Sequence, residues 1–211
     1  FSLAEAHEAG LVHRDIKPAN IYVARQAHEI DVVKVLDFGL VARYAAAEDA
    51  ATGTFEPIGD DERSGHALVG TPGYMAPEAI LGQPVDGRAD LYALGCVAFR
   101  LLSGREVFAR GTIPALLLAH VHTLPPPPSE GRFPELDALI LDCLAKRPED
   151  RPQTAAELRQ RLAALPVPAF ERWTQDQAEA WWAKLAPAID DEAFARTARV
   201  PTVMVKLAGI V

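Results

Sequence analysis

The segment from Arg88 to Ser103 constrains the fold more than any other part of the sequence. Its apolar residues recur at helical spacing, and Gly104 follows the last of them, where a glycine suits a helix C-terminus. We therefore expect a central helix that other helices surround. The residues that we place on its apolar stripe are Leu91, Leu94, Ala98, Leu101 and Leu102.

Helical spacing recurs elsewhere in the chain and predicts a mainly α fold of the α+β class. Residues 1–10 end on a glycine, and Ile113–His122 and Glu135–Ala145 each carry an apolar stripe. Thr154 with Glu157 forms the pattern of a capping box, which predicts the start of another helix. The proline run Pro125–Pro128 predicts a stiff extended loop.

A small β pair and a long loop complete the expected domain. Ile21–Ala24 and Val32–Leu36 read as paired strands, with Gln26–Asp31 as their connection. The segment from Gly39 to Pro77 has no clean period, and a loop of that length inside a compact domain is usually functional or disordered.

The last part of the chain reads as a separate tail. Pro166 and Pro168 predict a hinge, so we expect one domain over residues 1–164 and a tail over residues 165–211. All three tryptophans lie in this tail, on or near helical spacing, which favours a short helical appendage packed on the domain. A docking surface for another protein is the alternative interpretation of the tryptophans.

Composition excludes several classes of function. The chain has 211 residues, of which 49% are apolar and 24% charged, as in an ordinary globular protein. Its net charge of −8 argues against a nucleic-acid surface, which needs clustered Lys and Arg. No run of about 18 apolar residues predicts a membrane span.

The cysteines and histidines give no sign of a metal centre. Cys96 and Cys143 lie in apolar helical patterns, which predicts buried, reduced thiols and a cytoplasmic location. Several histidines lack metal-ligand spacing with cysteine or acidic partners, so we expect no functional role for them. They are His7, His28, His66, His120 and His122.

The loop His13-Arg14-Asp15-Ile16-Lys17-Pro18-Ala19-Asn20 concentrates the chemistry that phosphoryl transfer to a hydroxyl requires. Such a reaction needs a carboxylate to orient the hydroxyl and accept its proton, a cation near the moving phosphoryl group, and oxygen ligands for Mg²⁺. Asp15, Lys17 and Asn20 supply these three. Asp37, at the end of a predicted strand and followed by Phe38-Gly39, can add a second carboxylate ligand.

These motifs resemble the signature set of protein kinases. The segments Gly70–Glu78, Asp90–Gly95 and Arg151-Pro152 follow in the order that this family shows, and the resemblance covers about residues 1–164. The style of the motifs is similar to the eukaryotic-like serine/threonine kinases of bacteria. The implied fold is the C-terminal lobe of a kinase, with a small β pair carrying the catalytic and metal loops and with no N-terminal lobe.

The resemblance also implies roles for the residues of the site. Asp15 would be the catalytic base, Lys17 would face the γ-phosphate of ATP, and Asn20 and Asp37 would hold Mg²⁺. Thr71 would contact Lys17 and Asp15 and shape the platform for a protein substrate. Lysine two residues after the base, together with this threonine, is typical of kinases that act on serine and threonine.

Other matched residues would support the site. The resemblance implies that His13 and Phe38, the latter followed by Gly39, pack in the hydrophobic stack that links the two lobes. Glu78 and Arg151 would form a buried ion pair.

Two further residues would act on the catalytic loop itself. The resemblance implies that Asp90 opens the central helix and binds the backbone of that loop. Arg14 would pair with a phosphate on the activation loop. Ala67 stands four residues before Thr71, where the family often carries its phosphosite, so we expect a shifted acceptor, Ser64 or Thr54.

Twelve residues precede His13, and they contain no glycine-rich phosphate loop. Because the chain begins inside a predicted helix, we expect a fragment of a kinase that is inactive by itself. Val203–Lys206 looks like the strand that carries the ATP-binding lysine, but no glycine-rich loop precedes it, so we reject that assignment. The alternative function is a non-catalytic module that binds or regulates partners through this lobe and its tail.

Overall fold

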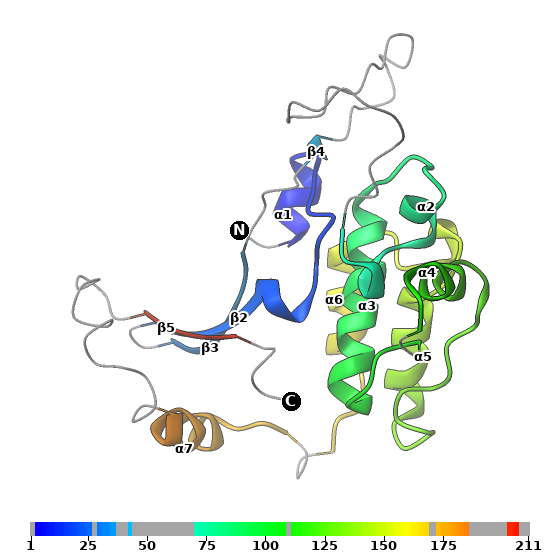
Figure 1. Cartoon of the computed structure of the whole chain (residues 1–211). Coiled ribbons are helices and arrows are strands. Elements are labelled where there is room, and N and C mark those ends of the chain that lie inside the picture. The colour runs from blue at the N-terminus through cyan, green and yellow to red at the C-terminus, as the bar shows by residue number, and fades with distance from the viewer. Residues whose placement is uncertain are drawn as a thin grey trace. The chain divides into compact units, whose positions relative to one another are not determined.

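The computed structural model describes residues 3–26, 29–36, 42–43, 70–108, 111–168, 172–185 and 202–206 (Figure 1). The chain divides into two compact units, of which the first joins residues 1–17 to residues 37–163 and the second joins residues 18–36 to residues 164–211. The sequence did not indicate that the segment 18–36 would belong with the tail. The predicted boundary of the catalytic domain near residue 164 stays a prediction.

The first unit is helical, with two short strands. Its helices surround α3, as the sequence predicted for the segment 88–103 (Figure 1). The short antiparallel pair joins β1 to β4, with Leu11 opposite Arg43 and Val12 opposite Ala42. In chain order the elements are α1 (Leu3–Glu8), β1 (Leu11–Val12), β4 (Ala42–Arg43), the 3₁₀ turn η3 (Pro72–Tyr74), α2 (Pro77–Ile80), α3 (Gly87–Ser103), α4 (Ile113–His122), α5 (Pro134–Cys143), the 3₁₀ turn η4 (Pro148–Asp150) and α6 (Ala155–Ala163).

Local chemistry fixes both ends of α3. The Asp86 side chain accepts a 2.9 Å hydrogen bond from the backbone N–H of Arg88, which caps the first turn. At the other end Gly104 adopts a left-handed φ of 72°, and its N–H donates to Arg100 O at 2.8 Å. The helix therefore begins one residue earlier than the sequence pattern suggested and ends where it predicted.

The core lies between α3 and α5. Tyr92, Cys96 and Phe99 from α3 pack in one buried cluster with Ile140 from α5 and Leu144 just after it. The two helices approach closely at Gly95, where an added Cβ would lie 2.8 Å from the Cβ of Cys143. Both thiols are buried and reduced, as predicted.

The predicted stripe of α3 was partly wrong. Leu91 is fully buried, but Leu101 is 50% exposed and Leu94, Ala98 and Leu102 are only partly buried. The face that fills the core carries aromatic and sulfur side chains instead. Because α3 is covered from several sides, leucine spacing alone does not indicate its most buried face.

The second unit is a three-stranded antiparallel sheet with one helix. The 3₁₀ turn η1 (Pro18–Asn20) leads into β2 (Ile21–Gln26), which pairs with β3 (Glu29–Val35) on one edge and with β5 (Thr202–Lys206) on the other. Helix α7 (Gln175–Leu185) contacts β3. Figure 1 shows this sheet, with its strands labelled β2, β3 and β5, and the helix labelled α7.

Two expectations for this unit are corrected. The predicted β pair is longer, because Glu29–Asp31 belong to β3 instead of a connection, and it has a third strand. The tail is not only helical, since it supplies β5. Val203–Lys206 forms a strand, but it pairs with β2, which gives no support to the rejected lysine-strand assignment.

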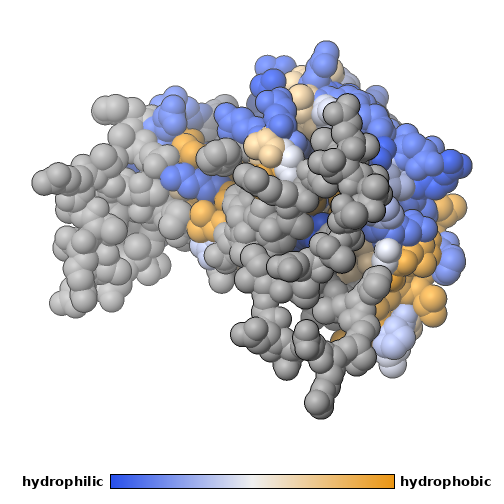
Figure 2. All heavy atoms as spheres, turned by 90° about the horizontal axis from the view of Figure 1, so that it is seen from above, coloured by the Kyte–Doolittle hydropathy of each residue, from blue (hydrophilic) through white to orange (hydrophobic). Residues whose placement is uncertain are grey.

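The surface is mixed in character. On the face seen in Figure 2, hydrophobic groups gather toward one edge of the described surface, and the rest of it is mainly hydrophilic. Three exposed apolar side chains lie on α4 or just after it: Ile113, Leu118 and Leu124. Within the part of the chain that the structure describes, every helix is too short or too polar to cross a membrane.

Candidate functional site

Asp90 of α3 organises the loop that begins at His13. The backbone N–H groups of His13 and Arg14 donate to the two oxygens of its carboxylate, each at 2.8 Å. His7 from α1 lies 2.9 Å from one of the same oxygens. Asp90 is 1% exposed, so a buried carboxylate uses three nitrogen partners to fix the start of the loop. The contact between Asp90 and this loop is the one that the sequence predicted.

Asp15, Lys17 and Thr71 meet in one polar cluster, which we call the Asp15 cluster. The Thr71 hydroxyl donates to Asp15 Oδ1 at 2.7 Å and accepts from Lys17 Nζ at 2.9 Å. Lys17 Nζ also lies 2.5 Å from Asp15 Oδ2. The side chains of Asp15 and Lys17 are 13% and 25% exposed, so the cluster is partly shielded but open to an approaching group.

The chemistry available in the Asp15 cluster is specific. An ionised carboxylate, an ammonium group and a hydroxyl lie within hydrogen-bond distance of one another. A carboxylate in this position can accept a proton from an approaching hydroxyl, and the ammonium can stabilise negative charge beside it. The structure brings together three of the predicted site residues, while their roles stay predictions.

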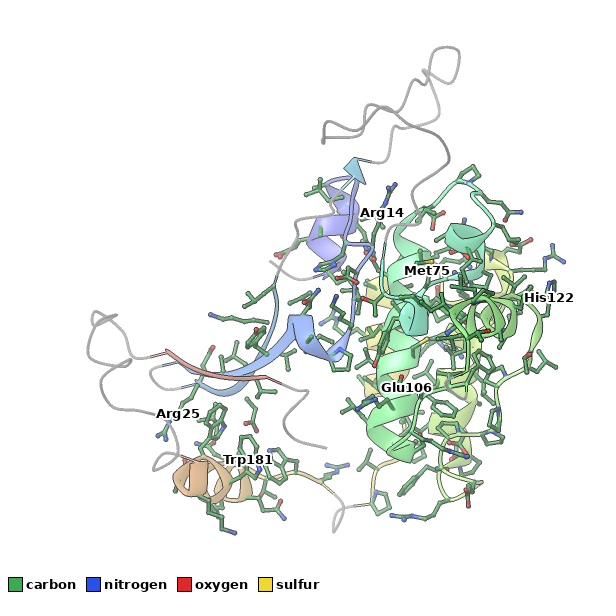
Figure 3. The ribbon with its side chains drawn as sticks, viewed as in Figure 1. Arg14, Arg25, Met75, Glu106, His122 and Trp181 are labelled. Atoms are coloured by element: carbon green, nitrogen blue, oxygen red, sulfur yellow. The ribbon has the colours of Figure 1, made fainter. Side chains whose placement is uncertain are left out.

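The segment Gly70–Tyr74 brings Thr71 to the loop. Gly70 has a φ of +127°, and an added Cβ there would lie 3.1 Å from the carbonyl oxygen of Arg14. Only glycine therefore combines this backbone conformation with so close an approach. Figure 3 labels Arg14 and Met75, whose methyl group also lies next to Gly70.

Glu106 is a residue near this segment that the sequence did not single out. It accepts a hydrogen bond from Arg100, and its carboxylate lies close to Gly73. Burial and the neighbouring Glu106 carboxylate raise the pKa of Tyr74 to about 12. The sequence neighbours of Glu106 carry no motif, so only the fold reveals that Glu106 faces the η3 turn (Figure 3).

Glu78 and Arg151 form the predicted ion pair. Two guanidinium nitrogens of Arg151 donate to the two carboxylate oxygens of Glu78, both at 2.7 Å. The Arg151 side chain is 0% exposed and that of Glu78 is 3% exposed. Arg151 also donates to the carbonyl oxygens of Ala145, Lys146 and Arg88. The pair therefore ties the start of α2 to α3 and to the η4 turn with its hydrogen bonds satisfied.

Asn20 belongs to the second unit. It ends η1, is 5% exposed, and accepts a 2.9 Å hydrogen bond at its backbone oxygen from the N–H of Leu36. This bond closes the β2–β3 hairpin beside Asn20, one of the two predicted magnesium ligands. Amide and carboxylate oxygens are ligands that Mg²⁺ prefers, and this donor set fits that ion.

Several predicted residues lie outside the described residues. They are Asp37, Phe38 and Gly39 of the metal loop, the acceptors Thr54 and Ser64, and Ala67, His28 and His66. Arg14 lies within the described residues. Burial lowers the pKa of its guanidinium group, and the nearby Asp90 carboxylate acts in the opposite direction. Among the residues that the structure describes, no group of three or more His, Cys, Asp and Glu side chains could hold a metal ion.

Two histidines have structural contacts that the sequence did not predict. Besides Asp90, the His7 ring lies against Gly87, where an added Cβ would be 2.7 Å from its Nδ1. His120 is 1% exposed, and its Nδ1 lies 2.8 Å from the Tyr92 hydroxyl. Isolated histidines give no signal in a sequence for contacts of this kind, because their partners come from distant helices.

Comparison with known proteins gives a consistent result. The family described as protein kinase domain matches residues 2–162. Serine/threonine-protein kinase Pkn1 of Myxococcus xanthus is 46% identical over 167 residues, which cover 76% of this chain and 22% of that protein. Serine/threonine-protein kinase PknB of Mycolicibacterium smegmatis is 39% identical over 160 residues, which cover 74% of this chain and 23% of that protein.

The PknB of Mycobacterium leprae is 41% identical over the same length. The chain thus spans less than a quarter of the length of these curated relatives. Protein kinases in general use ATP and a divalent metal ion. The motifs, the helix-rich fold and these matches lead to one conclusion: the chain belongs to the protein kinase family and is of the eukaryotic-like serine/threonine type found in bacteria.

Proposed function

We propose that residues 1–164 are the C-terminal, catalytic-loop lobe of a protein kinase that transfers the γ-phosphate of ATP to serine and threonine hydroxyls of proteins, with residues 165–211 as a tail. The observation that carries this proposal is the Asp15 cluster, in which a carboxylate, an ammonium and a hydroxyl meet within 2.5–2.9 Å. The relatives named above are serine/threonine kinases, which supports the same class of substrate.

Asp15 acts on the substrate hydroxyl in this proposal. One of its oxygens accepts from Thr71, which holds the carboxylate in a fixed orientation. The carboxylate orients the serine or threonine hydroxyl toward the γ-phosphorus and accepts its proton as the new O–P bond forms. The bond from that phosphorus to the β–γ bridging oxygen breaks, and ADP leaves. The Lys17 ammonium stabilises charge on the phosphoryl oxygens during transfer.

Asn20 and Asp37 are the residues that would hold Mg²⁺. A bound Mg²⁺ neutralises charge on the β- and γ-phosphates of ATP. Asn20 would supply its side-chain oxygen from the start of β2, where the Leu36–Asn20 hydrogen bond closes the hairpin. Asp37 would supply a carboxylate oxygen as the second ligand.

Phosphate transfer from ATP-Mg²⁺ to a generic protein substrate tests the proposal. We expect activity in the protein encoded by the complete reading frame and its loss in the Asp15→Asn variant. A folded, complete protein without phosphotransfer would contradict the proposal and favour a non-catalytic module that binds partners.

A further inference from the structure

Asp31 is held by two tryptophans of the tail. The indole N–H of Trp173 donates to Asp31 Oδ2 at 2.6 Å, and that of Trp182 donates to Oδ1 at 2.7 Å. Both carboxylate oxygens are therefore engaged by neutral donors of a segment more than 140 residues away in the sequence. Such hydrogen bonds to an ionised acceptor are the stronger kind.

Asp31 lies at an irregular point of the β2–β3 ladder. Asp31 lies within β3 and has a left-handed φ of 62°, which few residues other than glycine and asparagine or aspartate adopt. Trp182 is 2% exposed and packs edge-on against Trp181, with ring centroids 5.1 Å apart. Figure 3 labels Trp181 on α7. Two specific donors on one carboxylate, one of them from a buried tryptophan, indicate a built docking point.

The tail also covers the free edge of the hairpin. Strand β5 pairs with β2 over five residues, from Tyr22 opposite Lys206 to Gln26 opposite Thr202. The central strand β2 thus has partners on both edges, and the tail contacts the hairpin twice, through β5 and through α7. Release of the tail would leave one edge of β2 without backbone partners.

This hairpin carries Asn20, one of the two predicted metal ligands. It begins at Asn20 and ends at Leu36, whose N–H binds Asn20, and β5 also contacts the η1 turn that contains Asn20. We propose that the tail is an intramolecular positioning element, anchored at Asp31, whose docking on the hairpin is coupled to the binding of Mg²⁺-nucleotide at Asn20. The coupling rests on the proposed function.

Coupling of this kind works in both directions. If the docked tail favours the hairpin geometry that binds metal, bound Mg²⁺-nucleotide must strengthen docking by the same factor. Asp31, Trp173 and Trp182 are positioning residues in this proposal, since none of them touches the reacting atoms.

Hydrogen exchange of the peptide spanning β2 tests docking in the 211-residue chain. The side-chain amide of Asp31→Asn has one oxygen, so one of the two indole N–H groups loses its acceptor. We therefore expect the backbone amides of residues 21–26 to exchange at least several-fold faster than in the wild type. Trp181→Phe is the matched control, because the bonds to Asp31 come from Trp173 and Trp182, and we expect wild-type exchange there. Unchanged exchange of the α3 peptide would show that the helical unit stays folded in both variants.

Nucleotide titration in the complete protein tests the coupling. We expect the Kd for Mg²⁺-ADP and the KM for ATP to rise several-fold in Asp31→Asn, with kcat at saturating ATP unchanged and both constants unchanged in Trp181→Phe. Bound Mg²⁺-ADP should slow exchange of residues 21–26 in the wild type.

Three results separate the possible failures. If β2 of the Asp31→Asn variant exchanged its amide hydrogens at the wild-type rate, docking of the tail at Asp31 would be overturned. Faster exchange with an unchanged nucleotide Kd would overturn the coupling. A wild-type protein that binds no nucleotide would overturn the proposed function and the coupling together, whereas an exchange difference in that case would still support docking of the tail.

Discussion

The hydroxyl of Thr71 donates a 2.7 Å hydrogen bond to the carboxylate of Asp15, a residue 56 positions earlier in the sequence. The same hydroxyl accepts from Lys17, so one side chain orients both charged groups of the Asp15 cluster. A hydroxyl that donates to an anion and accepts from a cation fixes their geometry without changing their charge. Thr71 therefore links the loop at 13–17 to the segment that begins at Gly70.

Replacing Thr71 by valine removes this hydroxyl at nearly constant shape. We expect kcat of the complete protein to fall about 10- to 100-fold, because a hydrogen bond to a charged group contributes about 1.5–3 kcal/mol. Thr71→Ser keeps the hydroxyl and should restore most of the activity. Steady-state kinetics with ATP and a protein substrate measure both variants, and equal losses in the two would rule out the hydroxyl as the cause.

Gly70 provides a second test of the same region. Gly70→Ala places a Cβ 3.1 Å from the Arg14 carbonyl oxygen at a φ of +127°. We expect lower phosphotransfer, because the segment that carries Thr71 must shift away from the loop. Gly104→Ala is the control, since Gly104 also has a positive φ but an open space around its Cβ position. It should lower the free energy of unfolding by about 1–2 kcal/mol and leave kcat unchanged.

Arg151→Ala should destabilise the helical unit more than it affects chemistry. It leaves the Glu78 carboxylate buried without its partner, which typically costs about 3–5 kcal/mol. Urea unfolding monitored by circular dichroism measures this loss. Arg147→Ala breaks an exposed pair with Glu149 and should have no measurable effect. Equal midpoints for Arg151→Ala and the wild type would show that the ion pair does not stabilise the fold.

His120 should make stability depend on pH. Burial, with a smaller effect of Lys146, lowers its pKa from 6.5 to about 4. Below pH 6.5 the unfolded state therefore takes up a proton that the folded state does not, and stability falls as the pH drops from 6.5 to about 4. The slope from this group is at most about 1.4 kcal/mol per pH unit.

His120→Asn removes this titration and can still accept a hydrogen bond from Tyr92. The difference in unfolding free energy between wild type and variant, measured by urea unfolding at several pH values, should change mainly between pH 6.5 and 4 and level off above about pH 7.5. Carboxylates that titrate in the same range cancel in this difference. A difference that is constant over the whole range would contradict the assigned cause.

The sequence predicted the helices better than the sheet. Periodicity and end signals predicted α3 to within one residue and α4 in full, because an amphipathic helix carries both kinds of information in adjacent residues. The third strand could not be predicted, since β5 pairs with a strand nearly 180 residues earlier and nothing local specifies that partner. The same reason explains why Asp31 and the tryptophans gave no signal of their contact.

For the candidate site, motif order identified Asp15, Lys17 and Thr71, and the structure brings them together. The contacts of Asp90 and the Glu78–Arg151 pair were also predicted, because they followed from the family resemblance. Glu106 was missed, since a single glutamate after a helix has no motif of its own. Its partners come from η3 and α3, which only folding brings together.

The measurement that tests the central claim most directly is phosphotransfer from ATP-Mg²⁺ to a protein substrate by the complete protein, compared with its Asp15→Asn variant. Asparagine preserves the shape of the side chain but cannot accept the proton of the substrate hydroxyl at neutral pH. We predict phosphoserine or phosphothreonine product with the wild type and at least a 100-fold loss of kcat in the variant. Equal activity in the two proteins would contradict the assignment of Asp15 as the catalytic base.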